Sequence, residues 1–213
     1  MGDLNIQSII SRIIILIIAF TVHEFSHAKV ADMFGDMTPR TAGRLTLNPL
    51  KHLDPLGSLL LLFRGFGWAR PVPVDPYALG RASTSAMMLV ALAGPFSNFI
   101  MALFAVIPLR LGWLAWVPAG NLLPSADNFL YEFIFTNLAL TFFNLIPLPP
   151  LDGDKIAEHF FPPSWQRVQQ SIRPYGSVIL LTILFILPTL GFDLLGPILY
   201  PPITNITNLL IGY

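Results

Sequence analysis

The sequence predicts an all-α polytopic membrane protein, with about four to five transmembrane helices and a small membrane-associated β element between the first two. Hydrophobic residues make up 54% of the 213 residues and charged residues only 11%, whereas about a quarter of the residues in a soluble domain are charged. The mean hydropathy of +0.66 points the same way. Twelve basic residues balance twelve acidic ones, so the chain lacks the positive charge on which nucleic-acid binding depends.

The first helix is expected to continue beyond its apolar run. That run, Ile13–Val22, has ten residues, about half of what a membrane-crossing helix needs. We expect the helix to cross by continuing to about Ala31, which places His23–His27 inside the inner part of the bilayer. A cleaved signal peptide is the alternative, but Asp3 stands near the start in place of a basic residue and no small-x-small cleavage site follows. We therefore predict an uncleaved helix.

The next segment, 38–80, predicts short extended runs. Leu59–Phe63 and Trp68–Val74 flank a glycine turn at Arg64–Gly67. The prolines that alternate in the second run suit an edge strand. This pattern is the basis for the predicted β element.

Four later stretches carry no charged residue and predict the other helices: 82–109, 133–151, 174–192 and 194–213. They have 28, 19, 19 and 20 residues, close to or above the roughly 20 that a span requires. The last is the least regular, because Pro197, Pro201 and Pro202 remove backbone donors and favour a broken helix or an interfacial segment.

Basic residues are concentrated in two loops, which predicts the orientation of the chain. They are Arg40, Arg44, Lys51, Arg64, Arg70 and Arg81 after the first span and Lys155, Arg167 and Arg173 after the third. The opposite side has Arg12 and Arg110. By the positive-inside tendency both richer loops are cytoplasmic, so spans one and three run inward and end at the same membrane face. We expect a multi-pass protein of the plasma membrane whose chemistry faces the cytoplasm.

The strongest chemical pattern is His23-Glu24-Phe25-Ser26-His27 on the first helix. Histidines four residues apart share one helix face and can bind one metal ion. Glu24 lies about 100° around the helix, where it can take a proton from metal-bound water. A chance match is the alternative, but each ionisable group within a span costs about 2.5–3.5 kcal/mol, which favours a functional role.

A catalytic zinc ion takes three protein ligands and keeps one position open. Because the chain has no cysteine, the third ligand must be a histidine or a carboxylate; the candidates are His52, Asp54, Asp152, Asp154, Glu158 and His159. Topology favours Asp152, which ends an uncharged stretch and follows the rigid segment Pro147–Pro150. A plain helix-end charge at the interface is the alternative interpretation of Asp152.

Three motifs in this order and spacing resemble the core of the site-2 protease family of intramembrane zinc metalloproteases: His23–His27, Gly94–Asn98 and Asn144–Gly153. Asn48–Pro55 and Trp68–Pro73 are similar to its compact bacterial and archaeal members. No insertion is large enough for a PDZ domain, and no paired nucleotide-binding (CBS) module is expected. We expect one membrane-embedded metalloprotease domain over 1–213, with core motifs in 8–153 and C-terminal helices in 174–213.

The resemblance implies one zinc ion per chain, with His23, His27 and Asp152 as ligands and Glu24 as general base and acid. It implies that Asn144 steadies the substrate carbonyl or oxyanion; hydrogen bonding between helices is the alternative. For Asn98, orienting the site and packing the helices are both open, and we favour packing. His52 matches a family position, but a structural loop histidine is an equal alternative.

These features predict an enzyme that hydrolyses peptide bonds in or near transmembrane segments of membrane proteins. Its expected partners are a transmembrane protein substrate and the lipid bilayer, without nucleic acid. We expect the segment 58–74 to pair with the unwound substrate as an added strand. A metal transporter is one alternative, although it would show a path of histidines and acids through several spans. The other is a non-catalytic membrane adaptor, which would more readily have lost Glu24 or a ligand.

Overall fold

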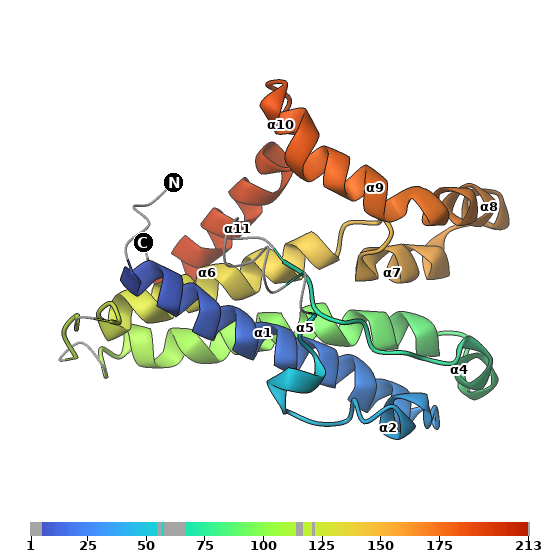
Figure 1. The fold of residues 1–213 in the computed structure, drawn as a ribbon, viewed down its shortest axis with the longest axis horizontal. Coiled ribbons are helices and arrows are strands. Elements are labelled where there is room, and N and C mark those ends of the chain that lie inside the picture. The colour runs from blue at the N-terminus through green and yellow to red at the C-terminus, as the bar shows by residue number, and fades with distance from the viewer. Residues whose placement is uncertain (1–5, 55–56, 58–66, 114–116, 121, 213) are drawn as a thin grey trace.

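Three long helices lie side by side and form the centre of the computed structural model, which describes residues 6–54, 57, 67–113, 117–120 and 122–212. They are α1 (Ile6–Met33), α5 (Ala86–Arg110) and α6 (Ala126–Asn144). Helix α5 packs against both of the others (Figure 1). The predicted continuation of the first helix through the histidine motif is confirmed, since α1 is one uninterrupted helix that ends at Met33.

The hydrophobic core lies where α5 and α6 meet α11 (Gly196–Ile211). Its buried members are Ala102, Ala105, Val106, Ile134, Leu138 and Ile203. The alanines of α5 allow the helix backbones to approach closely, which is how helices associate in lipid. A second cluster, formed by Ala31, Leu79, Ala86 and Val90, attaches the short helix α4 (Pro76–Ala82) to the end of α1 and the start of α5.

The helices between α6 and α11 are shorter. They are α7 (Asp152–Phe160), α8 (Pro163–Ile172), η2 (Arg173–Tyr175), α9 (Gly176–Leu181), η3 (Thr182–Ile186) and α10 (Leu187–Thr189). Helix α7 contacts α5. Figure 1 shows α9 and α10 away from the three central helices, and α11 back beside α6.

Three helical stretches of the described residues are long and apolar enough to cross a membrane: Ile6–Met33, Ala86–Arg110 and Pro163–Thr189. This composition agrees with an integral membrane protein. The helix expected within 133–151 instead occupies Ala126–Asn144, because the prolines after Ile146 exclude the helix there. It therefore includes Asp127 and Glu132 and is less apolar than the sequence pattern indicated.

The last helix differs from its prediction. We expected either a broken helix or an interfacial segment in 194–213; the break is not observed, since α11 is one helix of 16 residues with Pro201 and Pro202 inside it. Its first turn places Pro197 where a missing backbone donor costs nothing, as Pro does at the start of many helices.

The predicted β element between the first two spans is not confirmed. Residues 58–66, which include Leu59–Phe63, lie outside the described residues. The described part shows a single antiparallel bridge between Leu53 and Ala69 and two very short helices, α2 (Thr38–Thr41) and η1 (Pro49–Lys51). The buried Arg44 guanidinium donates to the carbonyl oxygens of Lys51, Arg70 and Pro71. A side chain therefore satisfies carbonyl groups that a neighbouring strand would otherwise bond.

Candidate metal centre

His23 and His27 lie one turn apart on the face of α1 that packs against α5. Both are buried, with 6% and 8% of their surface exposed, and their ring centroids are 4.7 Å apart. This is the juxtaposition that the four-residue spacing predicts.

Asp152, which follows the connection between α6 and α7, lies beside the two histidines. It is the first residue of α7, and its Oδ2 atom lies 3.1 Å from His23 Nε2 and 3.4 Å from His27 Nε2. Within the described part of the chain, this is the one group of three metal-ligating side chains whose ligand atoms all lie within 4.8 Å of one another. The remaining five candidates for the third ligand do not belong to it.

The three side chains fit a zinc ion. Asp152 Oδ2 is buried and has the two histidine Nε2 atoms as its close polar neighbours, so the three ligand atoms face a common point. Two imidazoles and one carboxylate form a ligand set typical of catalytic zinc sites. The backbone of Gly94 covers the site closely, because a Cβ atom there would stand 2.5 Å from His23 Nε2 and would also collide with His27 Nε2.

The other nitrogen of each ring is hydrogen bonded. His27 Nδ1 lies 2.7 Å from the carbonyl oxygen of Val90, and His23 Nδ1 lies 2.7 Å from Asn98 Oδ1. A carbonyl oxygen only accepts, so His27 carries a hydrogen on Nδ1, and in the neutral ring the lone pair is then on Nε2, toward the site. Partners of this kind orient metal-binding histidines and set their tautomer.

Glu24 follows His23 on α1 and is 8% exposed. It is near enough to the buried Arg44 for the two charges to interact: burial lowers the pKa of Arg44, and the Glu24 carboxylate opposes that shift. The carboxylate is thus held beside the two histidines and near a cation.

Asn144, the last residue of α6, forms a bond within its own helix. Its Nδ2 group donates to the Leu140 carbonyl oxygen at 3.0 Å. This bond links neither two helices nor the histidine–aspartate group, so the geometry alone favours neither role considered for Asn144.

The other candidates lie elsewhere. His52 is fully buried in the loop after α1, with Nε2 2.7 Å from the Thr46 carbonyl oxygen. Arg173 bonds the carboxylates of Asp154 and Glu158. His159 Nε2 lies 3.5 Å from the Ser85 hydroxyl.

Sequence reasoning missed Asn137 and Thr141, two buried polar residues on the face of α6 toward α5. A signal was present, since Asn137 lies in the uncharged stretch two helical turns before Asn144. Polar side chains inside a span are uncommon and tend to have a defined partner.

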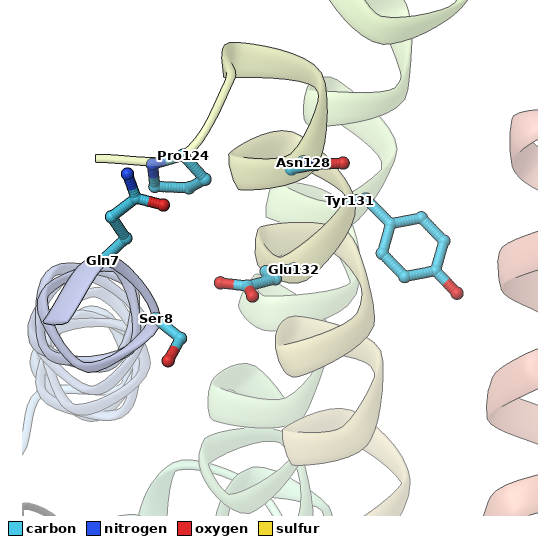
Figure 2. A pocket seen from close by; sticks show the side chains of 6 residues that line it. All are labelled: Gln7, Ser8, Pro124, Asn128, Tyr131 and Glu132. Atoms are coloured by element: carbon cyan, nitrogen blue, oxygen red, sulfur yellow. The ribbon is translucent and has the colours of Figure 1, made fainter. Parts of the chain in front are cut away.

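A separate cavity of about 330 Å³ lies at the opposite end of the helices. Figure 2 shows the side chains that line it, which are Gln7, Ser8, Pro124, Asn128, Tyr131 and Glu132. Ser8 and His23 are separated on α1 by about 22 Å at 1.5 Å per residue. The cavity therefore does not belong to the metal centre.

Comparison with known proteins identifies the family. The family description "Peptidase family M50" matches residues 116–187. "Putative zinc metalloprotease YwhC" of Bacillus subtilis is 43% identical over 190 residues, which are 88% of this chain and 84% of that protein. "Putative zinc metalloprotease Rip2" of Mycolicibacterium smegmatis is 34% identical over 82% of this chain and 66% of its own length. The Mycobacterium tuberculosis (strain H37Rv) protein of that name is also 34% identical, over 82% of this chain and 66% of its own length.

No solved structure matches the chain. The similarity to YwhC covers 88% of the chain at an identity that establishes common descent. As its motifs predict, this chain belongs to peptidase family M50, the site-2 protease family of zinc metalloproteases.

Proposed function

We propose that this protein is an intramembrane zinc metalloprotease that cleaves peptide bonds in or near the transmembrane segments of other membrane proteins, with one zinc ion held by His23, His27 and Asp152. The observation that carries the proposal is the convergence of these three ligand atoms, two of them buried on a helix apolar enough to span a membrane and the third from the start of α7. Zinc in such a site lowers the pKa of its bound water toward ~7 and polarises a carbonyl group.

Glu24 is the proposed general base and acid. Its carboxylate accepts a proton from the attacking water and passes that proton to the amine nitrogen that leaves when the peptide bond breaks. Its position one residue after His23 and its burial support this role. Asn144 is the proposed partner of the substrate carbonyl, because its amide nitrogen has a second hydrogen besides the one that it donates to the Leu140 carbonyl oxygen.

The proposed arrangement is a single membrane domain over 1–213 with four to five spans. Besides the three apolar stretches, α6 and α11 pack against α5, and this packing supports their insertion beside it. The basic loops support a metal centre toward the cytoplasmic side, and the plasma membrane is the proposed location. Trp68–Val74 is the described part of the segment 58–74 that we propose pairs with the unwound substrate. The antiparallel bridge between Ala69 and Leu53 supports an extended backbone there, although Arg44 already occupies the carbonyl oxygens of Arg70 and Pro71.

The test compares Glu24→Gln with the unchanged protein in cleavage of a single-span substrate in proteoliposomes. We expect Glu24→Gln to keep one zinc ion per chain and to lose a factor of about 10² or more in cleavage rate, because general acid–base catalysis contributes that much. Glu132→Gln is the matched control, since it makes the same change on α6 at the cavity remote from the histidines. Cleavage by Glu24→Gln at the unaltered rate would refute the assignment.

A further inference from the structure

A line of three buried polar side chains connects α1, α5 and α6. His23 Nδ1 lies 2.7 Å from Asn98 Oδ1, and Asn98 Nδ2 donates to Asn137 Oδ1 at 3.0 Å. Asn137 Nδ2 then donates to the Phe133 carbonyl oxygen at 2.9 Å. Both asparagines are fully buried, so these bonds are not exchanged for bonds to bulk water.

The line has a fixed direction that starts at Phe133. A backbone carbonyl oxygen only accepts, so Asn137 must present its amide nitrogen to Phe133 and its oxygen to Asn98. Asn98 must then present its nitrogen to Asn137 and its oxygen to His23. An amide oxygen also only accepts, and His23 therefore carries a hydrogen on Nδ1; in the neutral ring this leaves the lone pair of Nε2 for the site.

The two histidines differ in how firmly their partners fix the tautomer. The partner of His27 is the Val90 carbonyl, which cannot be reversed. The partner of His23 is a side-chain amide, which can rotate and offer a donor in place of an acceptor. A rotated Asn98 would move the hydrogen of His23 to Nε2, the atom that faces Asp152.

We propose that Asn137 is a positioning residue of the zinc site: by holding the Asn98 amide in one orientation, it keeps His23 in the tautomer that binds metal. This inference rests on the proposed function, because it takes His23 as a zinc ligand. The hydrogen bonds of the Asn137 side chain go to Asn98 and to the Phe133 carbonyl oxygen, so it acts on His23 through Asn98.

Helix packing is the competing role for Asn137, and the neighbouring Thr141 provides a control for it. Thr141 is buried one turn further along α6, and its hydroxyl lies 3.2 Å from the Pro95 carbonyl oxygen of α5 and 2.8 Å from the Asn137 carbonyl oxygen. It bonds α6 to α5 without contributing to the line. Thr141→Val thus removes a buried interhelical bond and leaves Asn98 and Asn137 in place.

The experiment measures zinc affinity by chelator competition on the full chain in lipid nanodiscs. We expect Asn137→Leu to weaken zinc binding by about 10–100-fold, the range for loss of a residue that orients a metal ligand. Thr141→Val should stay within about twofold of the unchanged protein, the scatter for independent sites. Asn137→Asp should also stay within about twofold, because in either protonation state it keeps an oxygen that accepts from Asn98.

A double substitution separates orientation from packing. In Asn98→Asp the carboxylate offers His23 only acceptors, so the tautomer no longer depends on Asn137. We expect Asn137→Leu to change zinc affinity by no more than about twofold in the Asn98→Asp background. An equal loss in both backgrounds would show a packing effect and overturn the proposal.

Three other results would also overturn it: unaltered zinc affinity in Asn137→Leu, an equal loss in Thr141→Val, or an equal loss in Asn137→Asp. If Asn137→Leu does not fold, as judged by its melting temperature, Asn137→Ala takes its place in the same cycle. A wild-type chain that binds no zinc would overturn the proposed function together with this inference, whereas the results above overturn the inference alone.

Discussion

At the scale of single residues, the metal centre depends on the lack of a side chain at Gly94. Gly94 lies on α5 opposite the two histidines, and its backbone approaches them closely enough that any Cβ atom would overlap both Nε2 atoms. The hydrogen bonds of the two Nδ1 atoms to Asn98 and to the Val90 carbonyl oxygen hold both rings, so neither ring can turn away from Gly94 without losing its bond.

We therefore expect Gly94→Ala to abolish zinc binding and cleavage. Gly80→Ala is the matched control, because Gly80 is also helical but has open space around the added methyl group. There we expect unaltered zinc binding and a gain of about 0.5–1 kcal/mol in stability, since alanine is the better helix former. Zinc content and melting temperature of both purified variants test this, and a Gly94→Ala protein with its full zinc content would contradict it.

The sequence predicted the side chains of the metal centre better than their surroundings. The four-residue spacing brought His23 and His27 together because helical periodicity is local. Asp152 was placed beside them by counting spans, a long-range argument that needed only the direction of two helices. The Val90 carbonyl and the Asn137 amide could not be found in this way, because the spacing within one helix does not identify which atom of another helix faces it.

At the scale of elements, the position of Asp152 depends on how α7 is held against α8 and η2. Arg173 Nε donates to Asp154 Oδ2 at 2.9 Å and its Nη2 group bonds Glu158, while Gln169 Nε2 donates to the Asp154 carbonyl oxygen at 2.7 Å. These contacts fix the first turn of α7, where Asp152 begins the helix.

The ion pair between Arg173 and Glu158 predicts that the stability of the fold depends on pH. Burial alone would raise the pKa of Glu158, but the hydrogen bond and charge of Arg173, helped by Lys155, hold it below the usual value. A carboxylate whose pKa is depressed by folding stabilises the fold fully above its unfolded pKa of about 4.3, and this contribution is lost as pH falls through the lower, folded value. Melting temperatures in detergent should therefore fall below about pH 5.

Arg173→Met should reduce that acid-dependent fall and lower stability near neutral pH by about 1.5–3 kcal/mol, the size of a hydrogen bond to a charged group. Arg167→Met on α8 is the control, because its exposed side chain should contribute little. Identical pH profiles for Arg173→Met and the unchanged protein would show that the ion pair does not stabilise the fold.

Elements with a simple apolar pattern were predicted well, and those that depend on backbone bonding were not. Helix α1 extends to Met33 as expected, whereas α6 begins earlier than its uncharged stretch. The prolines near Asp152 end α6, but those in α11 do not break it. The difference arises because a proline removes one donor only, and the rest of the helix can persist when its side chains pack, as Ile203 does against α5 and α6.

At the scale of the whole molecule, the metal centre connects the three central helices to the C-terminal helices, which make fewer contacts with the centre. Helices α1, α5 and α6 contact one another directly, while α7 packs on α5 and leads into the helices that lie apart from the centre in Figure 1. Two ligands come from α1 and the third from α7. A bound zinc ion would therefore connect the first helix to the C-terminal part of the chain.

Because the ligands are brought together only by folding, zinc should bind the folded protein far better than the unfolded chain and stabilise it. At a free zinc concentration of 100 times its dissociation constant the expected gain is about 2.7 kcal/mol. Chelation should lower the melting temperature of the unchanged protein, and added zinc should restore it. Asp152→Asn should show a much smaller zinc-dependent shift, because a neutral amide is a poorer zinc ligand than a carboxylate. If the protein binds one zinc ion per chain and its melting temperature does not change with zinc, the ion does not connect these two parts of the fold.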